Sequence, residues 1–210
     1  MGHIMESKQF RVKSLTWLSK VGISVPERLP LIDDFSIRPK GDILDRIICL
    51  NAVAAAAYGF DKIRAYSWLS QEKMLEKLTE SERSFLISDV GNVDIFKTQV
   101  EGMWALAWIV NIVQSLDFWS QCDPHFVAML PDLKTAESSS KFRARTHLRN
   151  KTEIGFEVDL AYCLHWFLRD AEINGNKLPK GVINYLVMER RRALEWAIGN
   201  EVWDGVSLDT

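Results

Sequence analysis

The sequence predicts an all-α fold: a compact multi-helix single domain with a C-terminal tail docked on it. Apolar residues recur at three- and four-residue steps along most of the chain, which is the period of an amphipathic helix. Strand-like alternation is rare, and Gly follows several of the periodic stretches, as it does at helix ends. The 210 residues, 47% of them apolar, suffice for one sizeable core and contain no clear linker, so we expect one domain over residues 1–210.

The periodic stretches place the helices in order. Val12, Leu15, Leu18 and Val21 follow one another in steps of three, which predicts a first helix over residues 10–21 with these side chains on one face. The other expected elements are helices over residues 42–58, 61–77, 93–114, 153–173 and 181–198, a short helix after residue 79, and proline-containing loops over residues 23–39 and 117–134.

Two local signals refine this outline. Thr79 and Glu82 fit a capping box, in which the hydroxyl accepts a free backbone N–H and the carboxylate reaches back to the N–H of the cap. The opening residues 1–4 fit a remnant of cloning, with Met5 as the native start. They are therefore left out of the functional reasoning.

Charge and hydropathy exclude several classes of protein. The net charge is -2, so no global electrostatic footprint for nucleic acid or an anionic membrane is present. The longest apolar stretch, residues 100–113, is interrupted by Glu101 and falls short of the roughly 20 residues that a membrane span needs. We expect neither a membrane nor nucleic acid as partner.

Cofactor and metal chemistry have no sequence signature. Phosphate-binding glycine loops, zinc-binding helix motifs and the serine nucleophile elbow are all missing. Cys49, Cys122 and Cys163 are far apart, which argues against a disulfide framework or a zinc site and fits free thiols in a reducing cytoplasm. We expect no cofactor and no metal. The histidines are isolated from one another: His3, His125, His147 and His165.

A polar stripe on one predicted helix is the first candidate site. Val158, Tyr162, His165 and Arg169 are three or four residues apart, so they share a face. A His beside an Arg serves acid–base chemistry or binds an anion. The alternative is a partly buried polar seam that joins two helices, which we favour because no cleft is evident from the sequence.

The arginine-rich last helix and the tail form the second candidate. Glu189 and Arg190 begin an acidic and basic run, and the tail that follows contains Trp203, Asp204 and Asp209. Arginine pairs bidentately with carboxylates. We therefore expect the tail to fold back, with Trp203 buried and Asp204 or Asp209 paired with Arg190 or another arginine of the last two helices. Recognition of an external acidic partner is the alternative.

Two further groups complete the candidates. Glu101 and Trp104 share a face of the expected helix over residues 93–114, where a carboxylate in apolar surroundings must be paired or have a raised pKa. A structural, paired Glu101 is the favoured interpretation and a catalytic one the alternative. Residues 134–151 are strongly basic but lack the aromatic interleaving expected of single-strand binders, so a solvated face is favoured over a nucleic-acid contact.

Several motifs resemble, in their order, one protein family. The motifs are Gly22-Ile23-x-Val25-Pro26, Leu29-Pro30-x-Ile32, Arg46, Ala52 to Ala57, Trp68-Leu69, Leu78-Thr79-x-x-Glu82, Gln99-Val100-Glu101-x-x-Trp104-x-Leu106-x-Trp108, Asp159-Leu160-x-Tyr162-x-x-His165-Trp166-x-x-Arg169, Glu189-Arg190-x-x-Ala193-Leu194-x-Trp196 and Trp203-Asp204-x-Val206-x-x-Asp209-Thr210. Together they resemble the bacterial family called domain of unknown function 4272. The resemblance covers most of the chain and implies no particular activity.

The chain departs from the family pattern at two positions. The family often has Arg where Cys163 stands, four residues after Asp159, so the resemblance implies that any pairing of those two positions is lost here. The family also tends to have Asn at the position of Glu195. An anion site that used this Arg would be missing from this chain.

These observations lead to two functional hypotheses of different classes. The first is a non-enzymatic cytoplasmic protein of bacterial type, an accessory or immunity-like module that binds another protein. The alternative is an enzyme, a hydrolase or transferase acting on an anionic substrate. Its site would combine the candidate catalytic and binding residues Glu101, His165, Glu189, Arg169, Arg190 and Asp204, with Trp104 nearby.

Overall fold

The computed structural model describes residues 2–88, 90–179 and 181–209 and confirms the all-α class. Within these residues every regular element is a helix. Contacts gather the helices in two compact units: a terminal unit of Met1–Ile37, Asp117–Ser120 and Arg149–Thr210, and a central unit of Arg38–Leu116 and Gln121–Leu148. The prediction that residues 1–210 form one domain is not tested by this division and stays a prediction.

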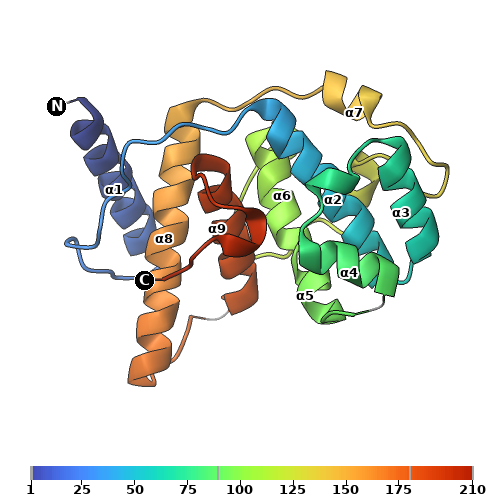
Figure 1. Cartoon of the computed structure of the whole chain (residues 1–210). Coiled ribbons are helices and arrows are strands. Elements are labelled where there is room, and N and C mark those ends of the chain that lie inside the picture. Colours follow the sequence, from blue (N-terminus) through green and yellow to red (C-terminus); the bar gives the residue numbers. More distant parts are fainter. Residues whose placement is uncertain (1, 89, 180, 210) are drawn as a thin grey trace. The chain divides into compact units, whose positions relative to one another are not determined.

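The terminal unit is built along one long helix. Helix α8 lies between α1 and α9, and both pack along it (Figure 1). Asn150 caps α8 by accepting the Glu153 N–H at 2.8 Å, and Gly175 ends it in the left-handed conformation with φ of 66°. The helices of this unit are α1 (Gly2–Lys20), α8 (Lys151–Asn174), α9 (Asn184–Ile198) and the 3₁₀ turn η3 (Trp203–Gly205).

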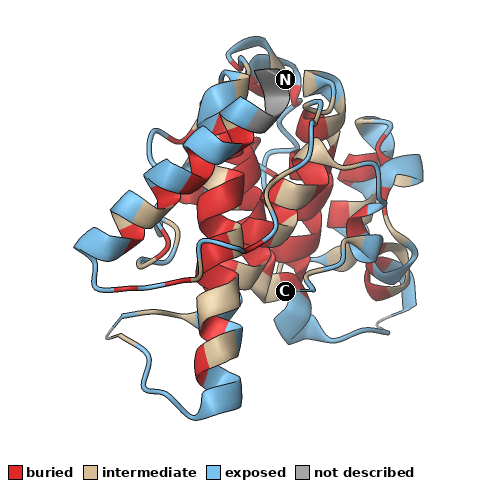
Figure 2. Ribbon diagram, turned by 90° about the vertical axis from the view of Figure 1, so that its left-hand side faces the viewer, coloured by how far each residue is buried: buried red, intermediate tan, exposed pale blue. Residues whose placement is uncertain are grey.

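Figure 2 shows that burial varies along α8, which is largely buried until its last turn. Residues 172–178, at the bottom of that view, are exposed. A side chain at Gly155 would meet the ring of Phe10 at 2.5 Å. The two helices therefore approach closely because position 155 has no Cβ.

The predicted inward face of the first helix is right for Leu18 and wrong for Val12 and Val21. Val12 is 63% exposed and Val21 is 41% exposed, whereas Phe10, Arg11 and Leu18 are buried. Steps of three residues rotate steadily around a helix with 3.6 residues per turn, so positions nine apart lie about half a turn away from each other. The helix also extends to Gly2, well before the expected start.

A buried ion pair joins α1 to α8. Arg11 donates Nη2–H to Asp159 Oδ1 at 2.9 Å and Nε–H to Oδ2 at 3.2 Å, and the two side chains are 5% and 0% exposed. Burial opposes the charge on Arg11, but the hydrogen bond to Asp159 raises the pKa of the guanidinium. Asp159 thus has a cation from α1 in place of the one that the family pattern suggested at Cys163, whose Sγ lies 3.9 Å from Oδ2.

The same arginine holds the proline-containing loop. Arg11 Nη1 donates to Leu29 O and Nη2 to Pro30 O, both at 2.8 Å, and the Ser7 hydroxyl donates to Ile32 O at 2.7 Å. The expected loop over residues 23–39 is therefore ordered by side chains of α1. It needs no secondary structure because its carbonyls find buried donors.

The docking of the C-terminal tail is confirmed, with a correction to its chemistry. Trp203 is 3% exposed and meets Trp196 edge-on, with ring centroids 5.6 Å apart. Arg191 holds the end of the tail through main-chain carbonyls: its guanidinium donates to Leu208 O and Asp209 O, each at 3.2 Å.

The Asp209 carboxylate does not form the expected pair with an arginine. The Asp209 carboxylate instead accepts the Ser207 hydroxyl at 2.7 Å. Carbonyls suit the contact better, because a neutral carbonyl loses less solvation on burial than a carboxylate does. Asp204 is exposed, and its pairing with an arginine stays a prediction.

The central unit surrounds α2. This helix packs against α3, α5 and α6, and its buried side chains include Ile43, Ile47 and Leu50. The elements of the unit are α2 (Lys40–Ala57), α3 (Lys62–Gln71), η1 (Leu75–Lys77), α4 (Glu80–Ser88), α5 (Val93–Thr98), α6 (Val100–Ile109), η2 (Phe126–Met129) and α7 (Ser140–Ala144).

The capping box at the start of α4 is confirmed, and it has a second function. Glu82 accepts the Thr79 N–H at 2.9 Å, and the Thr79 hydroxyl accepts the Glu82 N–H at 3.3 Å. The other oxygen of Glu82 pairs with Arg46 of α2, and both side chains are buried, at 0% and 4% exposure. One carboxylate therefore caps α4 and ties it to α2.

Two expected helices are shorter than predicted. The expected helix over residues 61–77 stops at Gln71, and Lys73 has a left-handed φ of 61°. The expected helix over residues 93–114 is divided at Gln99 and ends at Ile109, just before Asn111, which also has a φ of 61°. Asn adopts this region more readily than other side chains, which explains the second stop. The sequence pattern missed both because the apolar periodicity continues past these positions.

Replacing Arg11 by Met should lower the free energy of unfolding by about 3–5 kcal/mol, because Asp159 would be left buried without its partner. Chemical denaturation of the full chain measures the loss. Lys13→Met, at an exposed position of the same helix, is the matched control and should change stability little. Equal stability of the Arg11 and Lys13 variants would contradict the role given to this pair.

Removing residues 202–210 should lower the melting temperature by several degrees, since the buried Trp203 and the two carbonyl partners of Arg191 are lost together. Thermal unfolding followed by circular dichroism measures the shift. Val202→Ala, at a side chain that is 73% exposed, should melt like the unaltered protein. An unchanged melting temperature after the deletion would show that the tail adds nothing to stability.

Candidate binding pocket

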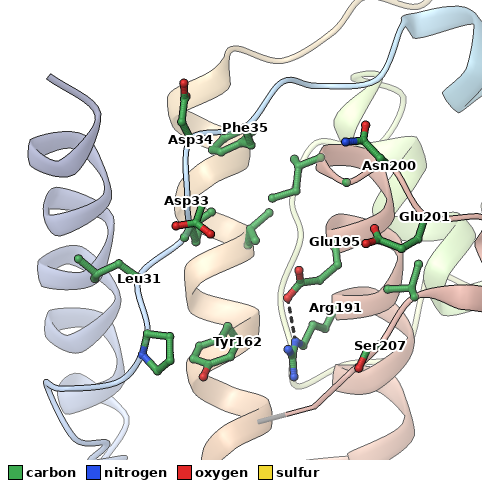
Figure 3. A pocket seen from close by; sticks show the side chains of 16 residues that line it. Leu31, Asp33, Asp34, Phe35, Tyr162, Arg191, Glu195, Asn200, Glu201 and Ser207 are labelled. Carbon is green, nitrogen blue, oxygen red and sulfur yellow. Dashed lines mark hydrogen bonds and ion pairs between the residues drawn. The ribbon is translucent and has the colours of Figure 1, made fainter. Parts of the chain in front are cut away.

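The terminal unit contains a pocket of about 530 Å³. Its walls are the loop over residues 30–35, the middle of α8, the second half of α9 and the segment 198–207 (Figure 3). The volume lies within the range of small-ligand sites. The loop wall is the segment that Arg11 holds, so the buried ion pair also shapes this pocket.

Arg191 lies at the base of the pocket and is itself 3% exposed. It donates Nε–H to Glu195 Oε1 at 3.1 Å, the contact drawn as a dashed line in Figure 3. It also contacts His165 Nδ1 through Nη1 at 2.5 Å, and its guanidinium carbon lies 4.9 Å from the ring centroid of Tyr162. Together with the tail carbonyls of Leu208 and Asp209, these partners occupy most of its donors.

The lining of the pocket is mostly acidic. Of the described residues that line it, one is basic, Arg191, and four are acidic: Asp33, Asp34, Glu195 and Glu201. Lys151 pairs with Asp34 at 2.9 Å, which neutralises part of this charge. In Figure 3, Glu195 and Glu201 extend from the α9 side toward the space between the walls. The pocket therefore offers carboxylates to a ligand, while its guanidinium is committed to the protein.

His165 forms part of the seam between α8 and α9. A guanidinium only donates, so His165 must accept at Nδ1 and carry its proton on Nε2. Burial, followed by the charges of Arg191 and Arg169, lowers the pKa of His165 to about 4. Nε2 is buried and has no hydrogen-bond partner among the described residues. The histidine is neutral near pH 7 and does not line the pocket.

Tyr162 adds a neutral hydroxyl to the pocket. Burial raises its pKa, although Arg191 and Arg11 act in the opposite direction. The side chain is half-buried and lines the pocket beside Arg191. Its hydroxyl therefore stays protonated and is able to donate to a ligand.

The other predicted residues of the terminal unit do not line this pocket. Arg169 is exposed and pairs with Glu172. Arg190 is fully buried and donates to the carbonyls of Asp117 and, at 2.8 Å, Ser120. It therefore anchors the turn in which Trp119 stacks on Trp17, with ring centroids 5.7 Å apart.

Glu189 has a buried carboxylate outside the pocket. Burial raises its pKa, while Arg192 at 3.7 Å acts in the opposite direction. Glu189 Oε2 has no hydrogen-bond partner among the described residues. A catalytic role of Glu189 stays a prediction.

Glu101 and Trp104 belong to the central unit. Glu101 is 2% exposed and accepts the Cys122 N–H at 3.0 Å, the buried and paired state that the sequence favoured. Trp104 is half-buried and meets Phe126 edge-on, with ring centroids 5.0 Å apart. The predicted enzyme set is thus divided between the units, so neither unit alone contains it.

The basic stretch of residues 134–151 is largely engaged by the protein itself. Arg143 donates to Asp45 at 2.7 Å, and Arg145 donates to the carbonyl of Met129. Within the same stretch Arg149 pairs with Glu153, and Lys151 with Asp34. This supports the interpretation as a structural and solvated segment.

Sequence reasoning missed the central residue of the pocket. It selected His165 and Arg169 on α8 and Arg190 on α9, whereas Arg191 is the arginine that contacts α8, the tail and the pocket. The signal was present in the spacing, since Arg191 and Glu195 are four residues apart on one face. Asp33 and Asp34 had no signal, because an irregular loop gives no period from which to place its side chains.

The described residues show neither a membrane span nor a metal cluster. None of their helices has the length and apolar character needed to cross a bilayer, and no three of their His, Cys, Asp or Glu side chains group as metal ligands would. Cys49, Cys122 and Cys163, all among the described residues, are not joined in a disulfide. Burial raises the pKa of both Cys49 and Cys163 to about 12, which makes them poor nucleophiles.

The fold and pocket define an all-α protein with a polar cavity, whose described lining holds one guanidinium and four carboxylates. The chain belongs to the family described as domain of unknown function (DUF4272), whose model matches residues 11–206. The resemblance seen in the motifs is thereby confirmed over nearly the whole chain. Comparisons with curated proteins and with solved structures give no match.

His165 should make stability depend on pH. Its folded pKa of about 4 lies below the ordinary 6.5, so its contribution is fully present above about pH 6.5 and is lost as the pH falls toward 4. Between about pH 7 and pH 4.5, the unaltered protein should lose more unfolding free energy than His165→Gln, which keeps an acceptor but does not titrate. His125→Gln, at an exposed histidine, should retain the full dependence. Parallel pH profiles of all three proteins would argue against this assignment.

Proposed function

We propose that this protein is a non-catalytic bacterial accessory protein of the cytoplasm, immunity-like in that it binds another protein. Its pocket in the terminal unit receives a basic side chain of that partner. The free, buried thiols of Cys49 and Cys163 suit a reducing compartment. The family resemblance supports the bacterial origin.

The observation that carries this proposal concerns the charged residues of the described lining: four are acidic, and the one basic residue is bonded to the protein. Arg191 already donates to Glu195, His165 and the carbonyls of Leu208 and Asp209. An incoming anion would find few free donors and would face a carboxylate-rich wall. A Lys or Arg side chain instead meets carboxylates with the complementary charge.

The enzyme alternative has less support. An acid–base group must reach the substrate, yet His165 is 2% exposed and neutral, and Glu101 is buried with its backbone partner. Arg190, the predicted anion-binding arginine, is held by two carbonyls. These side chains serve packing and chain anchoring, which supports a binding function in preference to catalysis.

Titration with matched peptides tests the proposal. An acetylated and amidated Gly-Ser-Arg-Ser-Gly peptide and its citrulline counterpart differ in charge but hardly in shape. In amide-resolved NMR of the full chain, the arginine peptide should shift resonances of Asn200, Glu201 and Ser207. Binding should weaken with added salt, because the pairing charges are solvent-accessible.

Charge variants give the control. The double variant with Asp33→Asn and Asp34→Asn should bind the arginine peptide at least about threefold more weakly, since exposed ion pairs are worth up to roughly 1 kcal/mol each. Glu172→Gln removes an exposed acid of the same unit outside the pocket and should leave binding unchanged. Equal binding of the citrulline peptide, or shifts confined to other residues, would rule out a basic-group pocket.

A further inference from the structure

The central unit contains a separate cavity of about 650 Å³. One wall is the end of α2, where Asn51, Ala55 and Tyr58 follow at steps of four and three residues and therefore share a face. The other wall is formed by the chain from Val127 to Glu137. None of the residues predicted as a site from the sequence lines this cavity.

Small residues on α2 and after it leave the space open. Ala55 contributes only a methyl group, and Gly59 has a left-handed φ of 96° with no atom within 4 Å of where a Cβ would lie. Aromatic side chains flank this gap: Tyr58 is 65% exposed and Phe60 is half-buried. Val127 on the opposite wall is 61% exposed. The cavity thus has apolar and aromatic sides, as small-molecule sites commonly do.

Asn51 provides a buried polar anchor in this cavity. It is 3% exposed, and its Nδ2 donates to Pro131 O at 3.1 Å, which fixes the orientation of the amide. None of the described residues donates to its Oδ1. Oδ1 is not one of the buried atoms that lack a partner, so it is accessible from the cavity and accepts a hydrogen bond from a ligand that brings a donor.

The two carboxylates of the second wall accept hydrogen bonds from its own turn. Asp132 Oδ1 accepts the Lys134 N–H at 2.8 Å, and Glu137 Oε2 accepts the Asp132 N–H at 3.1 Å. Arg64 joins the walls, because it stacks on Phe60 at 5.2 Å and donates to Lys134 O at 2.8 Å. The cavity is therefore pre-formed, and its two carboxylates are held by hydrogen bonds of their own turn.

We infer that this cavity binds a small, uncharged, planar molecule with one N–H or O–H donor. The ring lies against the aromatic wall of Tyr58 and Phe60, and Asn51 Oδ1 accepts the donor. A ligand of either charge would meet a like charge in this lining, which contains Asp132, Lys134 and Glu137. A molecule without a donor would make no hydrogen bond with Asn51 Oδ1. This site is independent of the acidic pocket of the terminal unit.

Indole and 1-methylindole form a matched pair of probes, since they share a planar uncharged ring and only indole has an N–H donor. Each is titrated into the isotope-labelled full chain, and amide resonances are followed by NMR. Indole should shift Asn51, Gly59 and Leu130, and 1-methylindole should bind at least about threefold more weakly because one hydrogen bond is lost. Absence of indole binding, or equal binding of both probes, would overturn the inference.

Two variants locate the site. Ala55→Leu fills the cavity and should abolish the indole-induced shifts, whereas Ala144→Leu, at an exposed position of α7, should leave them unchanged. The dispersion of the amide spectrum shows that each variant is folded. If Ala55→Leu distorts the spectrum, Ala55→Val is the smaller replacement and should still weaken the binding of indole. Indole shifts that persist in a folded Ala55 variant would place binding elsewhere and refute the assignment.

Discussion

The buried pair of Arg11 and Asp159 is the interaction on which the terminal unit depends. Its two side chains are almost fully buried, and an ion in such surroundings is tolerated only while its partner stays. The remaining donors of Arg11 hold the carbonyls of Leu29 and Pro30. The loop that forms one wall of the acidic pocket is thus positioned by the same guanidinium that joins α1 to α8. Packing of the helices and shape of the pocket have one common cause.

Three arginines of this unit perform the same physical task on different irregular segments. Arg11 holds the loop after α1, Arg190 holds the turn at Asp117 to Ser120, and Arg191 holds the tail, each through main-chain carbonyls. Segments without regular structure need donors for their buried carbonyls, and a guanidinium supplies several in one plane. This use explains why basic residues are plentiful near the pocket although its accessible surface is acidic.

The sequence predicts what depends on local spacing. The helical class, the capping box of Thr79 and Glu82, and the burial of Trp203 follow from residues near one another in the chain. The partner of Asp159 could not be predicted in this way, because Arg11 is 148 residues away. The spacing that includes Val12 and Val21 also indicated a different inward face for the helix of Arg11. Arg190 and Arg191 point about 100° apart around α9. Which of them reaches the pocket depends on how α9 packs against α8, and local spacing does not give that packing. The loop acids depend on Arg11, so the pocket could not be predicted before that pair was known.

The departure of this chain from its family pattern at Glu195 affects the pocket directly. Glu195 accepts the Nε–H of Arg191 and adds a negative charge to the lining. Asn, which the family tends to have there, is able to accept the same hydrogen bond through its shorter amide but contributes no charge. Arg191 would then keep its full charge beside the ligand, and the preference for a cation would weaken. The position four residues after Arg191 therefore sets how strongly negative this pocket is, since Asp33, Asp34 and Glu201 remain in its lining, while the anchoring of the tail by the same arginine stays unaffected.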